Sequence, residues 1–433
     1  MTSKKQLKAR VRARMAKTGE SYTAARQHVA GPAAARDGQA ADGGWRFTGG
    51  RHPSSAAIAA VLANQGVDVG EPLVFLAGGG IGAGYILWEF QHDGSRCVVL
   101  GFRNQWQYHD RWMAKTLGRL GVPYQEHRTS GVRGASDRLA AELAAGRPCV
   151  VLPDRYHAGY WHLPAAMDGH GGHPMVAYRL DEDQDAVLVD DRGRAPIRVP
   201  RERFDAARAR VGSYRNVLHV LGDAEPDEAT LAAAALDGLR DCAAHLSAAS
   251  DSFSLPAWRK WARLLVDTRN AKAWPKVFAD RRGLADALLS VWEGAEPVGV
   301  DGGNLRDLFA DGLDEAAALL DRPALAGLAG RFREIHGLWH DLAEAALPAD
   351  VPELGRVREL TAAVKESVMA DGSAGGQEAA QVARELAVAR AAANDVLEAA
   401  GDTGPLFGAL SARVAAIHEA ERESIARLAA LVA

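Results

Sequence analysis

The sequence has few cysteines and no long apolar run, and both shortages exclude classes of protein. Cys97, Cys149 and Cys242 lie far apart among 433 residues, too few for a disulfide framework and too scattered for a zinc cluster. The longest apolar runs, such as CVVLGF and PCVVLP, fall well short of the about 20 residues that a membrane-spanning helix needs. The lysine-rich start has no apolar segment behind it, so it does not fit a secretion signal. We therefore expect a cytoplasmic protein that does not insert into membranes, with the cysteines as small core residues.

Aromatic content and net charge are also modest, and the composition is that of an ordinary globular protein. Aromatic residues make up 6% of the chain, apolar residues 48% and charged residues 24%, with a net charge of −4. A chain of this length can form two or three domains, each with its own apolar core.

The positive charge of the chain is concentrated at its N-terminus. Residues 1–31 carry eight lysines and arginines against a single acid, Glu20. Leu7, Val11 and Met15 recur every four residues, which predicts a basic helix with a narrow apolar stripe. Such an arm could bind a nucleic-acid backbone or an acidic partner, or it could be a solvated extension. The cations expected to make such a contact are Lys4, Lys5, Lys8, Arg10, Arg12 and Arg14.

The remainder of the chain divides by composition into a linker and two domains. Residues 32–44 are rich in alanine, glycine and aspartate, which predicts a flexible linker. Residues 45–222 alternate between helix and strand patterns, whereas residues 223–433 are alanine-rich and helical throughout. We therefore predict an α+β domain followed by an all-α bundle. The tryptophans of the bundle are expected in its core, namely Trp258, Trp261 and Trp274.

Within residues 45–222 the pattern begins with an apolar helix and ends with strands. Ser54 and Ser55 are expected to cap the helix AAIAAVLANQ, which Gly66 ends. Helical patterns follow in RWMAKTLGRL and SDRLAAELAAG, and strand patterns in RCVVLGF and PCVVLPD. The last two strands, HPMVAYRLD and AVLVDD, are joined by the acidic turn EDQD, which predicts an antiparallel hairpin.

The order of several short motifs resembles one known family. H-x-S-S at the start of the first helix is followed by GGGIGAGY, D-R-Y-x-x-x-Y, H-P-M-V-A-Y and V-L-V-D-D. Over about residues 47–220 this order resembles the N-terminal domain of the BtrH-like family of butirosin-biosynthesis acyltransferases. The stretch VGVDGGNLRDLFADGLDEAAALL, residues 298–320, resembles the helical domain that accompanies it. The resemblance implies a papain-like fold, similar to that of cysteine peptidases, followed by a helical domain.

The resemblance also implies a catalytic set, one member of which is missing here. The family has a nucleophilic cysteine directly after a histidine at the first turn of the helix, where the helix dipole favours thiolate. In this chain the pair is His52 and Pro53. Proline suits the first turn of a helix but offers no atom that can attack an acyl group. Ser54 and Ser55 lie elsewhere around the helix, and we expect neither to replace the cysteine.

The general base and its orienting acid are still present in the sequence. By the resemblance, His173 corresponds to the base and Asp190, seventeen residues later on the next strand, to the carboxylate that orients its imidazole. A hairpin can place two such residues side by side at one end of a sheet. The pair could retain a chemical role or be a structural hydrogen bond left from an ancestral enzyme, and the sequence leaves both open.

Several other residues are expected to line the same cleft: His52, Ser54, Gly79, Gly80, Tyr85, Asp154, Tyr156 and Tyr160. The glycine-rich AGGGIGAGY lacks the Lys-Ser/Thr ending of a phosphate-binding loop, so we expect it to let the backbone approach the cleft, and no cofactor is predicted. The histidines of GHGGHP, with His157 and His162 nearby, follow no recognised metal-binding spacing, and no metal is predicted.

Three functions from different classes follow, in order of preference. The first is a pseudoenzyme that binds an acyl carrier protein, a peptide or another partner in the former active-site cleft. The second is a non-covalent acyltransferase, in which His173 deprotonates an amine that attacks a thioester directly, because a thioester is already activated. The third is a nucleic-acid-associated protein recruited by the basic arm. A second copy of the chain is a further candidate partner.

Overall fold

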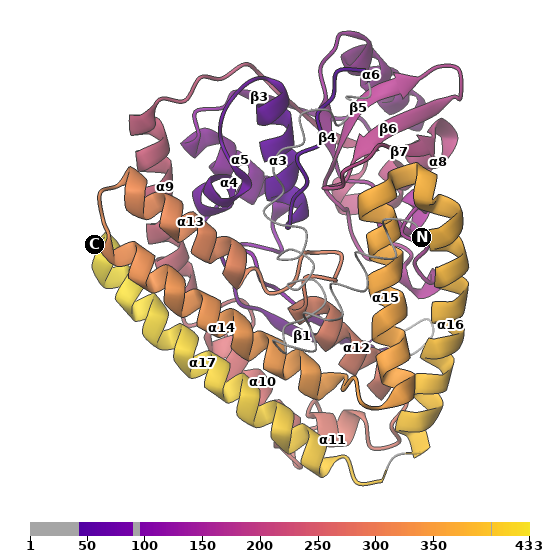
Figure 1. Ribbon diagram of the computed structural model, residues 1–433, viewed down its shortest axis with the longest axis vertical. Helices are drawn as coiled ribbons and strands as arrows, with labels where there is room; N and C mark the ends of the chain where they lie inside the picture. The colour runs from indigo at the N-terminus through magenta and orange to yellow at the C-terminus, as the bar shows by residue number, and fades with distance from the viewer. Residues whose placement is uncertain (1–42, 90–95, 400) are drawn as a thin grey trace, which may run out of the picture. The chain divides into compact units, whose positions relative to one another are not determined.

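The structure is a computed structural model that describes residues 43–89, 96–399 and 401–433 (Figure 1). The chain forms two units, Met1–Arg46 and Phe47–Ala433, and the second is described below. The basic arm, residues 1–31, and most of the expected linker lie outside the described residues, so the predictions made for them stay predictions.

Six short strands of the second unit form an antiparallel sheet in the order β3-β8-β4-β5-β6-β7. Their bounds are β3 Tyr124–Arg128, β4 Cys149–Val151, β5 Met175–Asp181, β6 Ala186–Asp190, β7 Ile197–Pro200 and β8 Val217–Leu221. Strands β5 and β6 form the predicted hairpin, in which Val176 lies opposite Asp190. The ribbon of β1 (Tyr85–Glu89) and β2 (Arg96–Leu100) is separate from this sheet.

Helix α3 (Pro53–Asn64) lies in the core of the unit. Its residues 53–62 are all buried, as expected for a helix that is apolar on every side. It contacts β5 and the short helix α4 (Glu71–Ala77). Proline occupies the first turn, as predicted, but the cap is His52 and not Ser54 or Ser55. The prediction was wrong because Pro53 is itself the first residue of α3, so the helix starts before both serines.

Four further helices lie between β2 and β8 in the chain: α5 His109–Arg119, α6 Val132–Ala144, α7 Arg155–Ala158 and α8 Arg201–Arg210. Helices α5 and α6 confirm the helical patterns of RWMAKTLGRL and SDRLAAELAAG. Helix α6 packs on β4 and β5, whereas α8 packs on β6 and β7.

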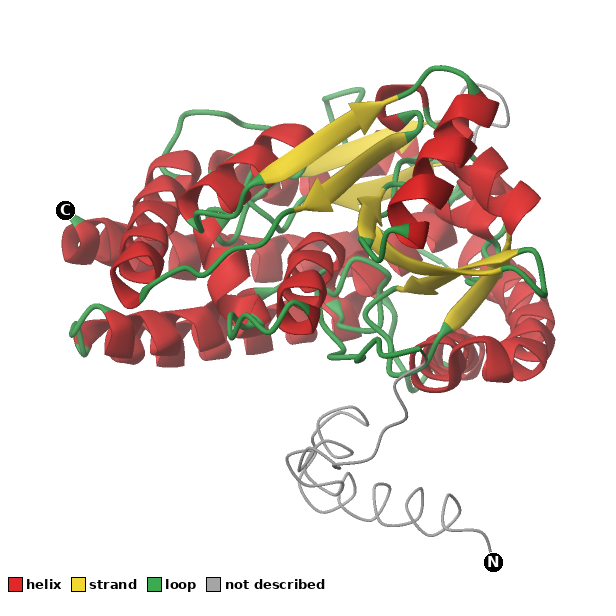
Figure 2. Cartoon of the chain, turned by 90° about the horizontal axis from the view of Figure 1, so that it is seen from above, coloured by secondary structure: helices red, strands yellow, loops and turns green. Residues whose placement is uncertain are grey.

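The remainder of the unit is helical, and Figure 2 shows the strands gathered together while long helices run across the rest. These helices are α9 Glu228–Leu246, α10 Pro256–Val266, α11 Trp274–Val277, α12 Leu284–Ala295, α13 Arg306–Leu319, α14 Ala324–Ala346, α15 Pro352–Asp371, α16 Gly376–Ala399 and α17 Gly404–Val432. Trp258, Trp261 and Trp274 are fully buried, as predicted. The architecture is therefore α+β, a sheet followed by a helical region, as the sequence indicates.

The hairpin of α15 and α16 lies beside β7 (Figure 1). A short 3-10 helix, Gly372–Gly375, reverses the chain between the two helices. The amide of Arg198 donates to Ser373 Oγ at 2.6 Å, and the amide of Ser373 donates to the Pro196 carbonyl at 3.0 Å. These bonds join α15 to the edge of the sheet. Among the described helices, none combines the length and apolarity required to cross a bilayer.

Candidate active site

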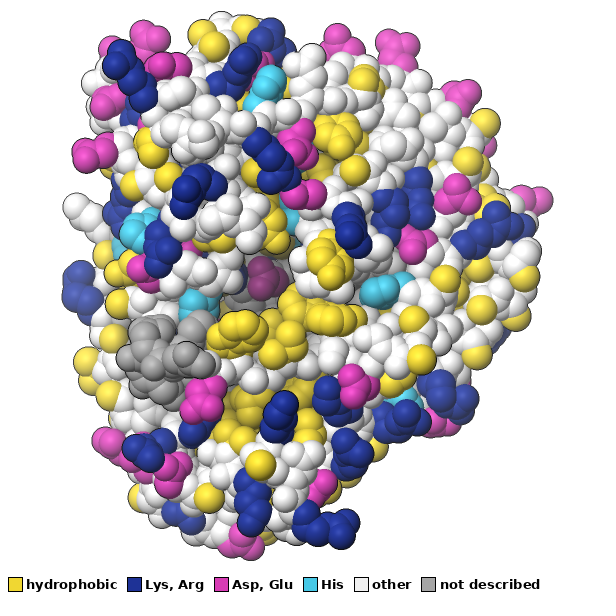
Figure 3. All heavy atoms as spheres, turned by 180° about the vertical axis from the view of Figure 1, so that it is seen from behind, with side chains coloured by type: hydrophobic (Ala, Val, Ile, Leu, Met, Phe, Trp, Pro, Cys, Tyr) yellow, Lys and Arg dark blue, Asp and Glu magenta, His cyan; other side chains and the backbone are white. Residues whose placement is uncertain are grey.

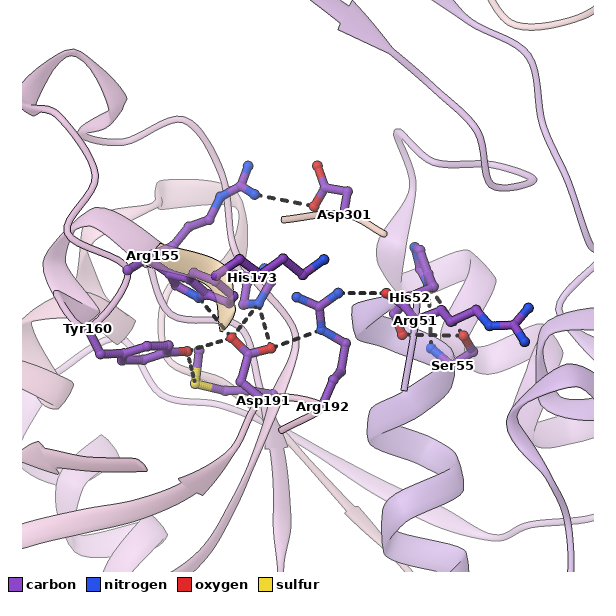
Figure 4. Close-up of polar contacts among 12 residues, drawn as sticks. Arg51, His52, Ser55, Arg155, Tyr160, His173, Asp191, Arg192 and Asp301 are labelled. Carbon is purple, nitrogen blue, oxygen red and sulfur yellow. Dashed lines mark hydrogen bonds and ion pairs between the residues drawn. The ribbon is translucent and has the colours of Figure 1, made fainter. Parts of the chain in front are cut away.

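The loop before β5, the end of β6 and the segment after α7 bring a histidine, an aspartate and a tyrosine together (Figure 4). Nε2 of His173 lies 2.9 Å from each carboxylate oxygen of Asp191. The Tyr160 hydroxyl donates to Oδ2 of Asp191 at 2.8 Å, and Trp161 Nε1 donates to the same oxygen at 2.9 Å. The side chains of His173 and Asp191 are 1% and 0% exposed. The carboxylate is thus buried with all of its polar contacts made by protein groups.

These contacts determine the protonation state of the pair. Burial raises the pKa of Asp191, but His173, Arg192 and the hydrogen bond from Tyr160 together outweigh burial and hold that pKa well below its usual value. An ionised carboxylate only accepts hydrogen bonds, so Nε2 of His173 carries a proton. Nδ1 makes no hydrogen bond with any residue that the structure describes. The pair therefore fixes the orientation of the imidazole and leaves Nδ1 as its unpartnered ring nitrogen among these residues.

The orienting acid differs from the predicted one. Asp190 was assigned by the resemblance, but the carboxylate that meets His173 belongs to Asp191. Asp190 is the last residue of β6 and pairs with Val176, whereas Asp191 follows the strand end. Successive side chains of a strand point to opposite faces, so only one of two adjacent aspartates can meet a given neighbour.

The vacant nucleophile position lies opposite these strand ends. Pro53 shares a narrow gap between α3 and the sheet with Pro174, Asp191 and Arg192, and this gap has no room for a water molecule. Nη1 of Arg192 donates to the Arg51 carbonyl at 2.6 Å, which ties the end of β6 to the start of α3. Pro53 and Pro174, the residue that follows His173, therefore line the same gap.

The first turn of α3 is closed by its own neighbours. Glu71 accepts the amides of Arg51 and His52 at 2.8 and 2.9 Å, and the Ser55 hydroxyl at 2.9 Å. Nδ1 of His52 accepts the Ser55 amide at 3.5 Å as the helix cap. Ser54 and Ser55 are 2% and 0% exposed. His52 and Ser54 are therefore core residues and not cleft residues, and neither serine is placed to attack an external substrate.

Burial governs the charge of the capping histidine. It lowers the pKa of His52 well below its usual value, and the nearby charges of Arg103 and Arg192 lower it further. His52 is consequently neutral, which suits its role as a hydrogen-bond acceptor.

The glycine-rich stretch is a packing element and not a rim of the cleft. A Cβ at Gly79 would lie 2.7 Å from Asn104, and one at Gly80 would lie 2.6 Å from Phe309 of α13. The Tyr85 hydroxyl accepts a hydrogen bond from Trp274 at 2.9 Å, and its ring stacks on Trp261. The prediction that Gly79, Gly80 and Tyr85 line the cleft is therefore wrong, because the helical region packs against this stretch.

Among the other predicted residues, only Tyr160 contacts the His173–Asp191 pair directly. Asp154 is fully buried, caps α7 through the His157 amide at 2.9 Å, and accepts the Gly169 amide at 3.0 Å. Tyr156 packs its ring on His157. Asp154 therefore shapes the segment that carries Tyr160, whereas the structure shows no contact of Tyr156 with the pair.

The helical region contributes charged residues that the sequence did not indicate. Asp301, in the loop between α12 and α13, pairs with Arg155 at 3.3 Å (Figure 4). Its side chain is 74% exposed, yet its pKa is lowered, because Arg155, His173 and Arg192 outweigh the effect of burial. Gly302 of this loop has a φ of +90°, and a Cβ there would lie 2.3 Å from the Arg51 carbonyl, so the loop approaches the start of α3 closely.

Lys365 of α15 is the second contribution of the helical region. Its amine donates to the carbonyls of Pro297 and Gly299, the second at 3.2 Å. Burial and the charge of Arg192 lower the pKa of Lys365 to about 7, against the effects of Asp191 and Asp301. Its amine is therefore close to half-protonated at neutral pH.

Figure 3 shows a hollow near the centre of one face of the protein, with an acidic side chain deep inside it.

No thiol replaces the missing nucleophile in the described residues. All three cysteines are free, and burial raises the pKa of Cys97 to about 11 and that of Cys149 to about 12. Burial likewise raises the pKa of Cys242, which lies on α9. Thiolate is the nucleophilic form of cysteine, so these side chains are unreactive at neutral pH.

Two groups of described residues each bring three possible metal ligands together: Asp110, Glu126 and His219, and Asp154, His157 and Asp168. Arg128 forms ion pairs with Asp110 and Glu126. Arg210 pairs with Asp168 at 2.7 Å, and both oxygens of Asp154 accept backbone amides. Because arginines or amides already bind these carboxylates, we assign no metal to either group.

Comparison with known families agrees with the geometry. The family described as Butirosin biosynthesis protein H, N-terminal, matches residues 52–192, which contain α3, His173 and Asp191. The family described as Domain of unknown function (DUF4872) matches residues 203–370, which contain Asp301 and Lys365. No curated protein matches the chain. The chain therefore belongs to the BtrH-like family, with the N-terminal domain of that family followed by a DUF4872 domain.

Proposed function

We propose that the protein transfers an acyl group from a thioester to an amine without a covalent enzyme intermediate. The observation that carries this proposal is the buried His173–Asp191 pair, which orients the imidazole and leaves Nδ1 without a hydrogen-bond partner among the described residues. The donor is a thioester on a coenzyme or on an acyl carrier protein. A papain-like fold for the N-terminal domain is part of the proposal, supported by a buried helix whose first turn lies opposite the end of a strand hairpin.

The reaction needs a base and no enzyme nucleophile. The amine attacks the thioester carbonyl, its proton passes to Nδ1 of His173, and the new C–N bond forms. The C–S bond then breaks, and the departing thiolate takes the proton back from His173. Asp191 holds the imidazole in the required tautomer and stabilises the transient imidazolium. An enzyme base contributes about 10²–10⁴ in rate, and binding both reactants side by side contributes more.

The buried carboxylate of Asp191 supports a catalytic role for the His173–Asp191 pair over a purely structural one. Removing an ionised group from water costs several kcal/mol unless its partners compensate, as those of Asp191 do here. Four side chains, Tyr160, Trp161, His173 and Arg192, are engaged in that compensation. An apolar residue in the same place would avoid the cost, whereas general-base chemistry requires the charge.

The test is a thioester aminolysis assay with a matched control. An acyl-pantetheine thioester and a primary amine are incubated with the full chain, and thiol release is followed. We expect His173→Ala to lower kcat by about 10²–10⁴ and Asp191→Asn to lower it less, with melting temperatures measured alongside. His157→Ala removes a histidine that also bonds an aspartate, at 3.0 Å from Asp168, and should leave the rate unchanged. Full activity in His173→Ala would refute the proposal.

A second function, binding without turnover, is favoured by one observation. Pro53 stands at the position of the nucleophile and lines a gap with no room for a water molecule, so it offers no atom for covalent chemistry. In that case the protein binds an acyl carrier protein, a peptide or another partner as a pseudoenzyme. A wild-type protein that binds a thioether analogue of the thioester but releases no thiol from the thioester itself would establish this function.

A further inference from the structure

The carbonyl oxygen of a thioester becomes an oxyanion when an amine attacks, and the start of α3 has few donors left to bind it. Glu71 accepts the amides of Arg51 and His52, and His52 accepts the amide of Ser55. Pro53 has no amide hydrogen. A helix N-terminus is usually an anion-binding site, but here the protein itself occupies the amides of Arg51, His52 and Ser55.

Arg192 offers the donor that the helix lacks. Its side chain is 2% exposed. Nε donates to Asp191 at 3.2 Å, and Nη1 donates to the Arg51 carbonyl at 2.6 Å. Nη2 is buried and has no hydrogen-bond partner among the residues that the structure describes. A buried guanidinium nitrogen without a partner is costly, and an anionic ligand atom would complete its hydrogen bonds.

The backbone of Arg192 supports the same interpretation. Its φ is +60°, a left-handed conformation that is rare for a residue with a side chain. Strained backbone of this kind is common at functional sites, where the conformation aims a side chain. Here it places the guanidinium between the His173–Asp191 pair and residues 51–55, as Figure 4 shows.

We propose that Nη2 of Arg192 binds the oxyanion of the tetrahedral intermediate, which makes Arg192 a second catalytic residue; this inference rests on the proposed acyl transfer. As the C–N bond forms, the π electrons of the carbonyl move to its oxygen, and Nη2 donates a hydrogen bond to that charge. When the carbonyl re-forms, the C–S bond breaks and the thiolate takes the proton from His173. Lys365 is less suited, because its amine already donates to two carbonyls.

The experiment uses Arg192→Gly, since glycine adopts a positive φ without strain and the backbone therefore keeps its conformation. We expect kcat for thioester aminolysis to fall about 10²–10³ with a smaller change in KM. Added guanidinium ion should restore part of the rate by occupying the vacated place. The matched control is Arg281→Gly, which removes another arginine with positive φ, half-buried and far from the site in sequence. The control should keep its rate and show no response to guanidinium.

A binding measurement separates this inference from the proposed function. The probe is a phosphonate analogue of the tetrahedral intermediate built on pantetheine, compared by calorimetry with a thioether analogue of the ground state. Wild type should bind the phosphonate more tightly than the thioether. Arg192→Gly should lose that preference but keep its affinity for the thioether. Turnover in wild type with an unaffected Arg192→Gly overturns only the role of Arg192. A wild type that neither turns over nor prefers the phosphonate overturns both proposals.

Discussion

At the scale of single residues, the amine of Lys365 links the helical region to the site through its charge. It lies in the field of Arg192, Asp191 and Asp301, and burial is the largest effect on its pKa. A lysine whose pKa drops from 10.5 to about 7 on folding binds fewer protons in the folded than in the unfolded chain over this range. The free energy of unfolding must therefore rise with pH between about 7 and 10.5, and the contribution is lost as the pH falls to 7.

The corresponding prediction concerns Lys365→Met, which removes the ionisation. Between pH 7 and pH 10 the wild type should gain about 1–3 kcal/mol of stability relative to this variant, allowing for solvent that reaches the half-buried amine. Denaturant unfolding of both proteins at the two pH values measures the difference. Identical pH dependence of the two proteins would show that the pKa of Lys365 is not lowered.

The residues of the site differ in how far the sequence could predict them. The hairpin of β5 and β6 was predicted correctly, because it is visible as two apolar runs and an acidic turn, whereas the catalytic role of His173 stays a prediction. The choice between Asp190 and Asp191 depends on which side of the strand end each side chain occupies, and a one-residue step reverses it. Asp301 and Lys365 had no local signal, since only tertiary packing brings their segments to this place.

At the scale of elements, helix α17 is anchored by one buried ion pair. Arg306 of α13 donates to Glu421 of α17 at 2.8 and 2.9 Å, and both side chains are 0% exposed. Trp258 and Trp339 donate to the same carboxylate at 3.1 and 2.9 Å. Arg306 also donates to the carbonyl of Gly82 at 3.0 Å, which connects α13 to the glycine-rich stretch.

Breaking this pair should therefore destabilise the whole unit. Glu421→Gln leaves the charge of Arg306 buried without its counter-ion, and we expect a loss of about 3–5 kcal/mol in the free energy of unfolding. The control is Glu419→Gln on the same helix, where an exposed pair with Arg422 is lost and the change should stay within about 0.5 kcal/mol. Equal stability of the two variants in denaturant unfolding would contradict the anchoring role.

The glycine-rich stretch shows why an element can be recognised and still be misplaced. Its composition predicts close backbone approach, and close approach is what the structure shows, for example between Gly82 and the Arg103 carbonyl. The partner, however, is the neighbouring core and not a substrate. Glycine content indicates that something lies near the backbone but carries no information about what it is.

At the scale of the whole molecule, the sequence predicted an α+β segment followed by a helical region. It did not predict how the helical region packs against that segment. Periodicity indicated a mixed segment followed by helices, and the family resemblance is confirmed. Residues of the helical region nevertheless reach the site: the Asp301 loop packs on the start of α3, and α15 carries Lys365. Contacts between distant segments depend on tertiary packing, which local patterns do not encode.

We propose that His173 acts as the base at the BtrH-like site and that the acyl group is transferred without a covalent intermediate. The most direct test is intact-protein mass spectrometry after incubation with an acyl-pantetheine thioester. Wild type should carry no acyl adduct, whereas Pro53→Cys, which restores a thiol opposite the strand ends, should gain one acyl mass on that position. The adduct should disappear when His173→Ala is added to Pro53→Cys, because the thiol then lacks its base. An acyl adduct on the wild-type protein, or none on Pro53→Cys that is correctly folded, would contradict the account.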